Sequence, residues 1–267
     1  MCSLTDILTK VSRRAVGLGA TLIVIVLGAS IASPSIATES AKYEKRSWSF
    51  YGVLGTYDRA SLQRGLQVYT EVCAACHGLK RVAFRNLLDL GFTEEEAKAI
   101  AASYDVSDGP NEEGDMYMRP GRLSDYFVSP FPNDNAARAS NNGSLPPDLS
   151  LITKARTGGP DYLYSLLTGY SDPPEGESLL EGMSYNSAFP GHQIAMPPPL
   201  VSDAVIYIDG TNATIPQMSQ DITQFLSWAA ESKLEERKRL GLKVMIFLII
   251  LTGLLYAVKR RVWSGLH

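Results

Sequence analysis

The sequence predicts a mainly helical domain with long loops, exported across a membrane and held there by one C-terminal transmembrane helix. Three observations predict this: segments with apolar residues at helical spacing, long stretches rich in Gly, Pro, Asn and Asp between them, and an uncharged run over 244–258. The chain has 267 residues, of which 45% are hydrophobic and 20% are charged, so its overall composition is that of a globular protein.

Residues 1–37 have the layout of a secretory signal peptide that is cleaved. Basic residues precede an uncharged stretch over 15–31, and small residues lead to Ala37, where we expect cleavage. An uncleaved first transmembrane helix is the alternative, because 17 uncharged residues come near the lower limit for spanning. Pro34 favours cleavage, because proline disrupts a helix at that point. The exported domain is then residues 38–232.

Two helices are predicted in the first half of this domain. One spans 57–72, because its apolar residues follow helical spacing and Asp58 can cap its start. The other begins at Thr93, where Thr93 and Glu96 are spaced as a capping box, and continues to about Ala102.

Loops and short elements follow. Residues 105–150 and 171–200 are rich in turn-forming residues and predict mostly loop. Between them, a short helix over 160–168 has proline in its first turn and Gly169 after its end.

A small hairpin and a last helix complete the predicted domain. Segments 205–208 and 213–215 flank an Asp-Gly turn at 209–210 and predict the hairpin. The last helix starts at about Ser219 and can run on into the membrane anchor.

The uncharged run over 244–258 predicts the transmembrane anchor. A buried core helix is the alternative, but the run is apolar on every face and basic residues follow it at once. A basic juxtamembrane helix over 233–243 precedes it. Basic residues flank both ends, so the signal peptide decides the orientation: if 38–232 is exported, the tail 259–267 lies in the cytoplasm. This predicts a single-pass protein of the inner (cytoplasmic) membrane with its domain on the periplasmic side, or on the intermembrane-space side in an organelle.

Charge is unevenly distributed along the chain. The whole protein has a net charge of -3, whereas residues 39–232 carry 25 acidic and 14 basic side chains. An acidic exported domain between basic ends excludes a nucleic-acid-binding protein and fits a membrane protein.

Cys73, Cys76 and His77 form a C-x-x-C-H sequence, the signature of covalent haem c attachment. Each thiol can form a thioether to a haem vinyl group, and the adjacent histidine is then held as an axial iron ligand. A thiol–disulfide motif or a zinc half-site is the alternative. The former usually lies on a βα unit, and the latter needs more Cys or His ligands than this chain has. We therefore predict one covalently bound haem c.

Met196 is the predicted sixth ligand, because the prolines at 197–199 stiffen the loop that presents its thioether. His192 competes from four residues earlier, and Met183 is one of several methionines that belong by default to the core or surface. His267 is excluded because it lies beyond the anchor. His/Met ligation fills both axial positions and points to electron transfer, whereas a haem enzyme with an open sixth position is the alternative.

Longer motifs surround these residues. They are Arg64–Tyr69, Asp108–Asn111, Met118–Gly121, Asn141–Ser150, Ser165–Tyr170 and Ile194–Pro199. Along most of residues 43–264 the chain thereby resembles the cytochrome c1 family, the membrane-anchored haem c subunit of the ubiquinol:cytochrome c oxidoreductase (bc1 complex). The resemblance implies a cytochrome c-type haem domain with long loop insertions and a small hairpin, with Met196 as sixth ligand. It also implies Arg156 as a haem propionate contact, for which an ordinary surface arginine is the alternative, and Tyr162 as an aromatic residue near the haem.

The resemblance further implies a function in respiratory or photosynthetic electron transport. The Rieske iron–sulfur protein, beside cytochrome b, would pass electrons to this haem, and a soluble basic cytochrome c would collect them; the chain alone would not be an enzyme. Residues 157–232 support the last step, because they contain nine acidic residues and no Lys or Arg, although acidic runs are commonly just solvated faces. A free-standing anchored cytochrome that shuttles electrons and a non-redox structural protein are the competing hypotheses.

Overall fold

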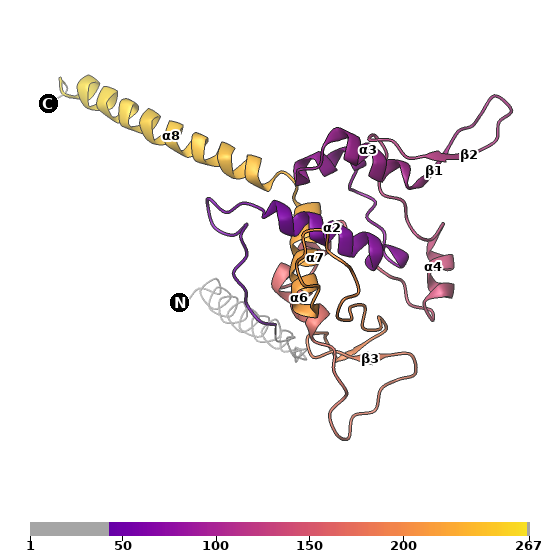
Figure 1. The fold of residues 1–267 in the computed structure, drawn as a ribbon. Coiled ribbons are helices and arrows are strands. Elements are labelled where there is room, and N and C mark those ends of the chain that lie inside the picture. Colours follow the sequence, from indigo (N-terminus) through magenta and orange to yellow (C-terminus); the bar gives the residue numbers. More distant parts are fainter. Residues whose placement is uncertain (1–42, 266–267) are drawn as a thin grey trace, which may run out of the picture. The chain divides into compact units, whose positions relative to one another are not determined.

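A computed structural model describes residues 43–265, and in this part the chain is mainly helical, as predicted (Figure 1). The predicted signal peptide lies outside the described residues. The elements are α2 (Arg59–Glu71), η1 (Cys73–Ala75), η2 (Phe84–Leu90), α3 (Glu94–Ala102), β1 (Asp105–Asp108), β2 (Tyr117–Pro120), α4 (Asp134–Ser140), α5 (Ile152–Ala155), α6 (Gly159–Thr168), β3 (Ser184–Tyr185), β4 (Gln193–Ile194), α7 (Ile215–Ala230) and α8 (Leu234–Trp263), where η denotes a 3₁₀ helix.

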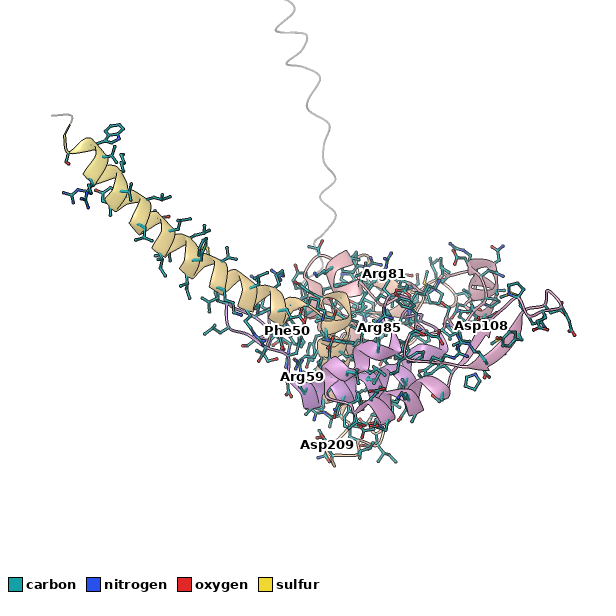
Figure 2. The ribbon with its side chains drawn as sticks, turned by 90° about the horizontal axis from the view of Figure 1, so that it is seen from above. Phe50, Arg59, Arg81, Arg85, Asp108 and Asp209 are labelled. Atoms are coloured by element: carbon teal, nitrogen blue, oxygen red, sulfur yellow. The ribbon has the colours of Figure 1, made fainter. Side chains whose placement is uncertain are left out.

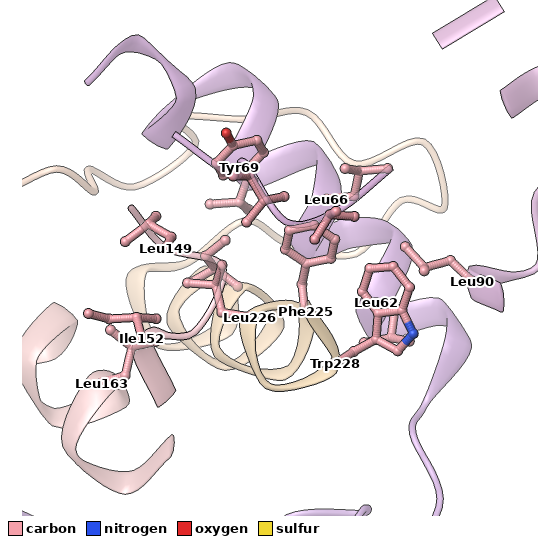
Figure 3. Close-up of a cluster of buried hydrophobic side chains, with 14 of the residues drawn as sticks. Leu62, Leu66, Tyr69, Leu90, Leu149, Ile152, Leu163, Phe225, Leu226 and Trp228 are labelled. Carbon is pink, nitrogen blue, oxygen red and sulfur yellow. The ribbon is translucent and has the colours of Figure 1, made fainter. Parts of the chain in front are cut away.

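The helices α2 and α7 form the centre of the core and make the most extensive contact between two elements. Their facing side chains, among them Leu66 and Phe225, are buried and lie between the two helices (Figure 3). Gly65 permits this close approach, because a Cβ atom at that position would lie 2.2 Å from the carbonyl oxygen of Asp221. The short helices α5 and α6 pack on α7 as well, so α7 is in contact with much of the domain.

The predicted helices of the first half are confirmed together with their caps. The side chain of Asp58 accepts a hydrogen bond from the amide of Ala60, 3.0 Å away, at the start of α2. Thr93 and Glu96 form the predicted capping box of α3. Each cap satisfies amide groups that have no partner inside the helix, which is why short sequence signals located these two helices.

The hairpin predicted at 205–215 is wrong, because the structure has no strands there. Val205 and Tyr207 are buried in the core, whereas Ile206 and Ile208 point into solvent, so the alternation that predicted strands is present. The Ile206 carbonyl, however, accepts a hydrogen bond from the Gln67 side chain and not from a partner strand.

Two antiparallel hairpins form elsewhere: β1 pairs with β2, and β3 pairs with β4. They and α4 are short elements within the stretches predicted as mostly loop, and most residues of those stretches belong to no helix or strand.

The last helix begins earlier than predicted and does not run on into the anchor. Its cap is Thr214, whose hydroxyl accepts a hydrogen bond from the amide of Gln217, and α7 ends at Ala230. The chain leaves the helical path at 231–233, and α8 then continues for 30 residues. Among the described residues, α8 is the helix that is long and apolar enough to cross a membrane, and its apolar window is not buried in the domain.

Candidate haem-binding site

The C-x-x-C-H sequence forms a tight turn directly after α2. The amide groups of Cys76 and His77 both donate to the carbonyl oxygen of Cys73, over 3.1 and 2.9 Å, so the turn has a fixed shape. Cys73 is half-buried against the core and Cys76 is exposed, and both thiols are free. The turn thus presents two unpaired thiols on a rigid frame at the end of a core helix.

Burial sets the protonation states at this turn. It raises the pKa of the Cys73 thiol to about 12, so the thiol is neutral at physiological pH. It also lowers the pKa of His77, although the hydrogen bond to Pro147 opposes this shift. His77 is therefore held as neutral imidazole, the form that binds a metal.

His77 has one ring nitrogen engaged and one available. Its Nδ1 lies 2.8 Å from the carbonyl oxygen of Pro147, and because a carbonyl only accepts, Nδ1 must carry the proton. The histidine backbone is fixed as well, since the Tyr69 hydroxyl donates to its carbonyl oxygen over 3.1 Å. This is the usual arrangement behind a metal-binding histidine: the bonded Nδ1 orients the ring and leaves Nε2 as the ligand atom.

Met196 lies half-buried against the same hydrophobic core as Cys73. Its carbonyl oxygen accepts a hydrogen bond from the hydroxyl of Tyr170 over 3.1 Å, which fixes the backbone at this residue. Met183 is not among the residues packed against this core; it lines a cavity of about 550 Å³ together with Tyr170 and Pro198. Of these two methionines, Met196 is the one in the cluster that holds the C-x-x-C-H turn.

His192 directly precedes β4, in the loop that connects β3 to it. Its ring stacks on Tyr185 with centroids 5.6 Å apart, and its Nδ1 lies 3.3 Å from the carbonyl oxygen of Asn186. The residue adopts a left-handed backbone with φ of +57°. Its ring is thus engaged with the hairpin that precedes the methionine.

Asn186 and Tyr170 complete the support of the methionine loop, a role that no sequence pattern indicated for either residue. The side chain of Asn186 is fully buried, donates to the carbonyl oxygen of Leu166 over 2.8 Å and accepts from the amide groups of Ala188 and Phe189. It therefore ties the β3–β4 segment to α6. Tyr170 lies within one of the quoted motifs, but no spacing signals either contact.

Arg156 and Tyr162 lie close enough to interact electrostatically. Arg156 is exposed after α5, and Tyr162 is buried on α6, with its ring edge-on to that of Tyr43. Burial raises the pKa of Tyr162, and the positive charge of Arg156 partly opposes that shift. Arg156 makes no ion pair within the described residues, so its charge is available to an anionic group.

The donor set fits a covalently attached haem. Two free thiols, a neutral imidazole with a free Nε2 and a thioether on a braced loop are the groups that haem c requires. The zinc alternative lacks ligands, since the described part of the chain has no group of three or more His, Cys, Asp or Glu side chains placed to hold a metal ion.

Comparison with known proteins gives one consistent result. The model of the cytochrome c1 family matches residues 48–266. Cytochrome c1 of Rhodospirillum rubrum is 46% identical over 272 residues, which cover 96% of this chain and 98% of the relative. The mitochondrial cytochrome c1 heme protein of Saccharomyces cerevisiae is 53% identical, covering 82% of this chain and 72% of the relative.

A protein named cytochrome b/c1 from Bradyrhizobium diazoefficiens is 50% identical over 250 residues, and the match spans 36% of that longer protein. A family match over most of the chain, with relatives at this level of identity, decides the assignment. The chain belongs to the cytochrome c1 family, and it is a covalent haem c protein that acts as an electron-transfer subunit of the bc1 complex and is not an enzyme on its own.

Proposed function

We propose that this chain receives electrons from the Rieske iron–sulfur protein and passes them to a soluble, basic cytochrome c. Cys73 and Cys76 would carry the haem thioethers, and His77 and Met196 would be the axial ligands. When bound, the haem supplies an iron that alternates between the ferrous and ferric states. The observation that carries this proposal is the pair of braced axial groups, His77 held through Pro147 and Met196 held through Tyr170.

The surroundings of the alternative ligands also support Met196. Met183 is not among the residues packed against the core that contacts Cys73 and Met196, and the ring of His192 is stacked on Tyr185. With His77 and Met196 in both axial positions, no position is left for a substrate, so the site would exchange electrons only.

Arg156 and Tyr162 would stand at the propionate side of the haem. An exposed guanidinium pairs well with a carboxylate, and Arg156 is the last Lys or Arg before Lys233. Buried Tyr162 would cover the adjacent face. The two roles rest on the resemblance, and the charge of Arg156 acts on the Tyr162 hydroxyl by lowering its pKa against the effect of burial.

The acidic surface supports docking of a basic carrier, but fewer residues contribute than the sequence suggested. Of the nine carboxylates in 157–232, Asp161 and Asp221 are buried, and Asp209 and Glu231 form ion pairs. The remaining five, all unpaired in the described structure, are Asp172, Glu175, Glu177, Glu181 and Asp203. Together with exposed Glu112, Glu113 and Asp115 at the tip of the β1–β2 hairpin, they would attract a positively charged partner.

We propose cytochrome b as the membrane partner, which the relative named cytochrome b/c1 supports. Residues 1–37 would be a cleaved signal peptide, 38–232 the exported haem domain, 233–243 a basic juxtamembrane segment, 244–258 the anchor and 259–267 a cytoplasmic tail. The haem domain would then lie on the periplasmic side of the inner membrane, or on the intermembrane-space side in an organelle. Protease added to intact spheroplasts should digest the domain and leave the tail.

Optical and redox titration of Met196→Leu and Met196→His in membranes tests the ligand set. We expect a large fall in reduction potential in both variants and new carbon monoxide binding in the leucine variant, with Met183→Leu as the matched control that changes neither. An unchanged spectrum and potential in the Met196 variants would move the ligand to His192 or Met183 and reopen the haem-enzyme hypothesis.

Salt dependence tests the acceptor. The rate of electron transfer to a basic cytochrome c should fall as ionic strength rises and should fall further in Glu175→Gln/Glu177→Gln. Glu94→Gln, whose carboxylate pairs with Lys98, is the control. A rate that ignores both salt and the double substitution would contradict electrostatic docking.

A further inference from the structure

Residues 51–55 form a short loop that is fastened to the base of α8; we call it the anchor-side loop. The ammonium group of Lys238, in the second turn of α8, donates to the carbonyl oxygen of Phe50 over 2.6 Å and to that of Gly55 over 3.0 Å. Lys238 thus joins both ends of the loop. Figure 1 shows this segment beside the first turns of α8, and Figure 2 places Phe50 at the base of that helix.

A second set of contacts fixes the chain on leaving the loop. Glu235 of α8 accepts a hydrogen bond from the amide of Tyr57 over 2.8 Å and forms an ion pair with Arg59, also over 2.8 Å. Gly55 allows the turn to close, because a Cβ atom there would lie 1.9 Å from the carbonyl oxygen of Tyr51. The loop is therefore held rigidly against α8 from both sides.

The tip of this rigid loop is apolar and exposed. Val53 is 72% exposed, Leu54 is 79% exposed and Tyr51 is 47% exposed. Two neighbouring aliphatic side chains held in water on a braced loop serve no packing purpose within the domain. Such a tip usually marks contact with a partner or a membrane.

Position along α8 indicates which partner. The apolar part of α8 begins at Leu240, two residues and about 3 Å of helix after Lys238, and the uncharged run follows from Val244. That spacing places the loop in the interfacial layer of a bilayer spanned by α8. Exposed Arg237, Arg239 and Lys243 surround the same level of the helix and can pair with the phosphate groups of lipid headgroups.

We propose that the anchor-side loop is a second membrane contact, with Val53 and Leu54 inserted among the headgroups and upper acyl chains. Tyr51 would lie at the headgroup level, as interfacial aromatic residues do. Two points of attachment, one helix and one loop, would fix the tilt of the haem domain over the bilayer. This inference goes beyond electron transfer and depends only on α8 being in the membrane.

Spin labels on the full haem-loaded chain in phosphatidylcholine–phosphatidylglycerol vesicles test the loop. Single cysteines would replace Val53, Leu54, Ile208 and Ile249 in a Cys2→Ser background, because the thioethers occupy Cys73 and Cys76. We expect collisions with oxygen to exceed collisions with a water-soluble nickel complex at positions 53 and 54. Ile208 is 99% exposed, adjoins Asp209 away from the base of α8 (Figure 2) and should show the reverse ratio.

The label at Ile249 separates failure of the loop from failure of the anchor. If position 249 collides with oxygen while 53 and 54 collide with nickel, α8 spans the bilayer and the proposal is wrong. Labels at 53 and 54 that neither reagent reaches would also overturn it, because that result means burial against protein. The same measurement in the complex with cytochrome b should give the lipid pattern again.

Orientation of the haem provides a second readout. In oriented multilayers, Val53→Ser/Leu54→Ser should broaden the angular distribution of the haem plane relative to the membrane. Ile206→Ser/Ile208→Ser removes two aliphatic side chains that are even more exposed but lie away from α8, and should leave the distribution unchanged. An equal distribution in both double variants would refute the two-point attachment.

Discussion

At the scale of single residues, the fold holds Met196 by its backbone. The hydroxyl of Tyr170 donates to the Met196 carbonyl oxygen, and burial raises the pKa of that phenol, so it stays protonated and remains a donor at any physiological pH. The segment before the methionine is tied to α6 through the buried amide of Asn186. The thioether is thus presented by a loop whose path is set elsewhere.

Tyr170→Phe should loosen this presentation without changing the ring. The Met196 carbonyl loses its partner, which should cost about 1 to 3 kcal/mol in the free energy of unfolding. The reduction potential should fall, but by less than in Met196→Leu, because the thioether is still present. Chemical denaturation and potentiometric titration measure the two effects.

Tyr185→Phe is the matched control, since the Tyr185 hydroxyl has no hydrogen-bond partner among the described residues. If the two variants have the same free energy of unfolding and the same reduction potential, the Tyr170 hydroxyl does not position the methionine loop.

The sequence could predict residues of the candidate site only where a local sequence pattern indicates them. Cys73, Cys76 and His77 are recognisable because their chemistry requires one spacing, and Met196 because prolines follow it. Tyr170 and Asn186 act through contacts that join residues 20 or more positions apart, and such contacts leave no local pattern. The supporting residues therefore needed the structure.

At the scale of elements, the helix caps could be predicted from the sequence, whereas the strand pairings could not. The starts of α2 and α3 depend on caps formed within a few residues, and the sequence located both. Strand pairing depends on what lies opposite. The alternation at 205–208 arises from one-sided burial against the core, whereas the true hairpin between β1 and β2 is fastened by Arg119 in a stretch rich in turn residues.

Gly65→Ala should disturb the contact between α2 and α7. The added methyl group would meet the Asp221 carbonyl oxygen at 2.2 Å and the Phe225 Cβ at 2.6 Å, so the helices must separate, at a cost of about 1 to 3 kcal/mol. Gly241→Ala in α8 is the control, because nothing lies within 4 Å of its added Cβ and alanine favours a helix. Thermal unfolding of the full chain compares them, and an unaffected Gly65→Ala would contradict this close packing.

The β1–β2 hairpin should weaken in acid. Hydrogen bonds from Arg119 lower the pKa of both Asp108 and Asp125. A carboxyl group whose pKa is lowered in the folded protein stabilises the fold at pH values above its ordinary pKa of about 4. That contribution is lost as the pH falls through the lowered pKa. Backbone amides of 105–120 should therefore lose hydrogen-exchange protection between about pH 5 and about pH 2.5, after correction for intrinsic rates.

Arg119→Gln should reduce this pH dependence, since the carboxyl groups then titrate in their ordinary range. A hairpin in the unaltered protein that is equally protected at both pH values would rule out the ion pairs as its fastening.

At the scale of the whole molecule, the haem domain does not end where its core helix ends. Leu234 is buried, and Glu235 and Lys238 hold the segment over 50–59. A truncated chain of residues 38–243 should consequently be more stable than one of 38–232, by about 2 to 4 kcal/mol from the added apolar burial and hydrogen bonds. Urea denaturation of the two soluble domains measures the difference, and equal midpoints would show that the first turns of α8 contribute nothing.

The short break at 231–233 connects the anchor to α7, the most deeply buried helix of the domain. Glu231 locks this joint, because its carboxylate pairs with Lys154 and Arg237 while its carbonyl oxygen accepts a hydrogen bond from Tyr57. In mechanical terms the connection between the domain and the membrane helix is rigid and is not a flexible linker. A force that tilts the membrane helix therefore acts directly on α7 at the centre of the core. We therefore expect the haem to keep its position relative to the membrane helix, so that the electron donor and acceptor have to move to it.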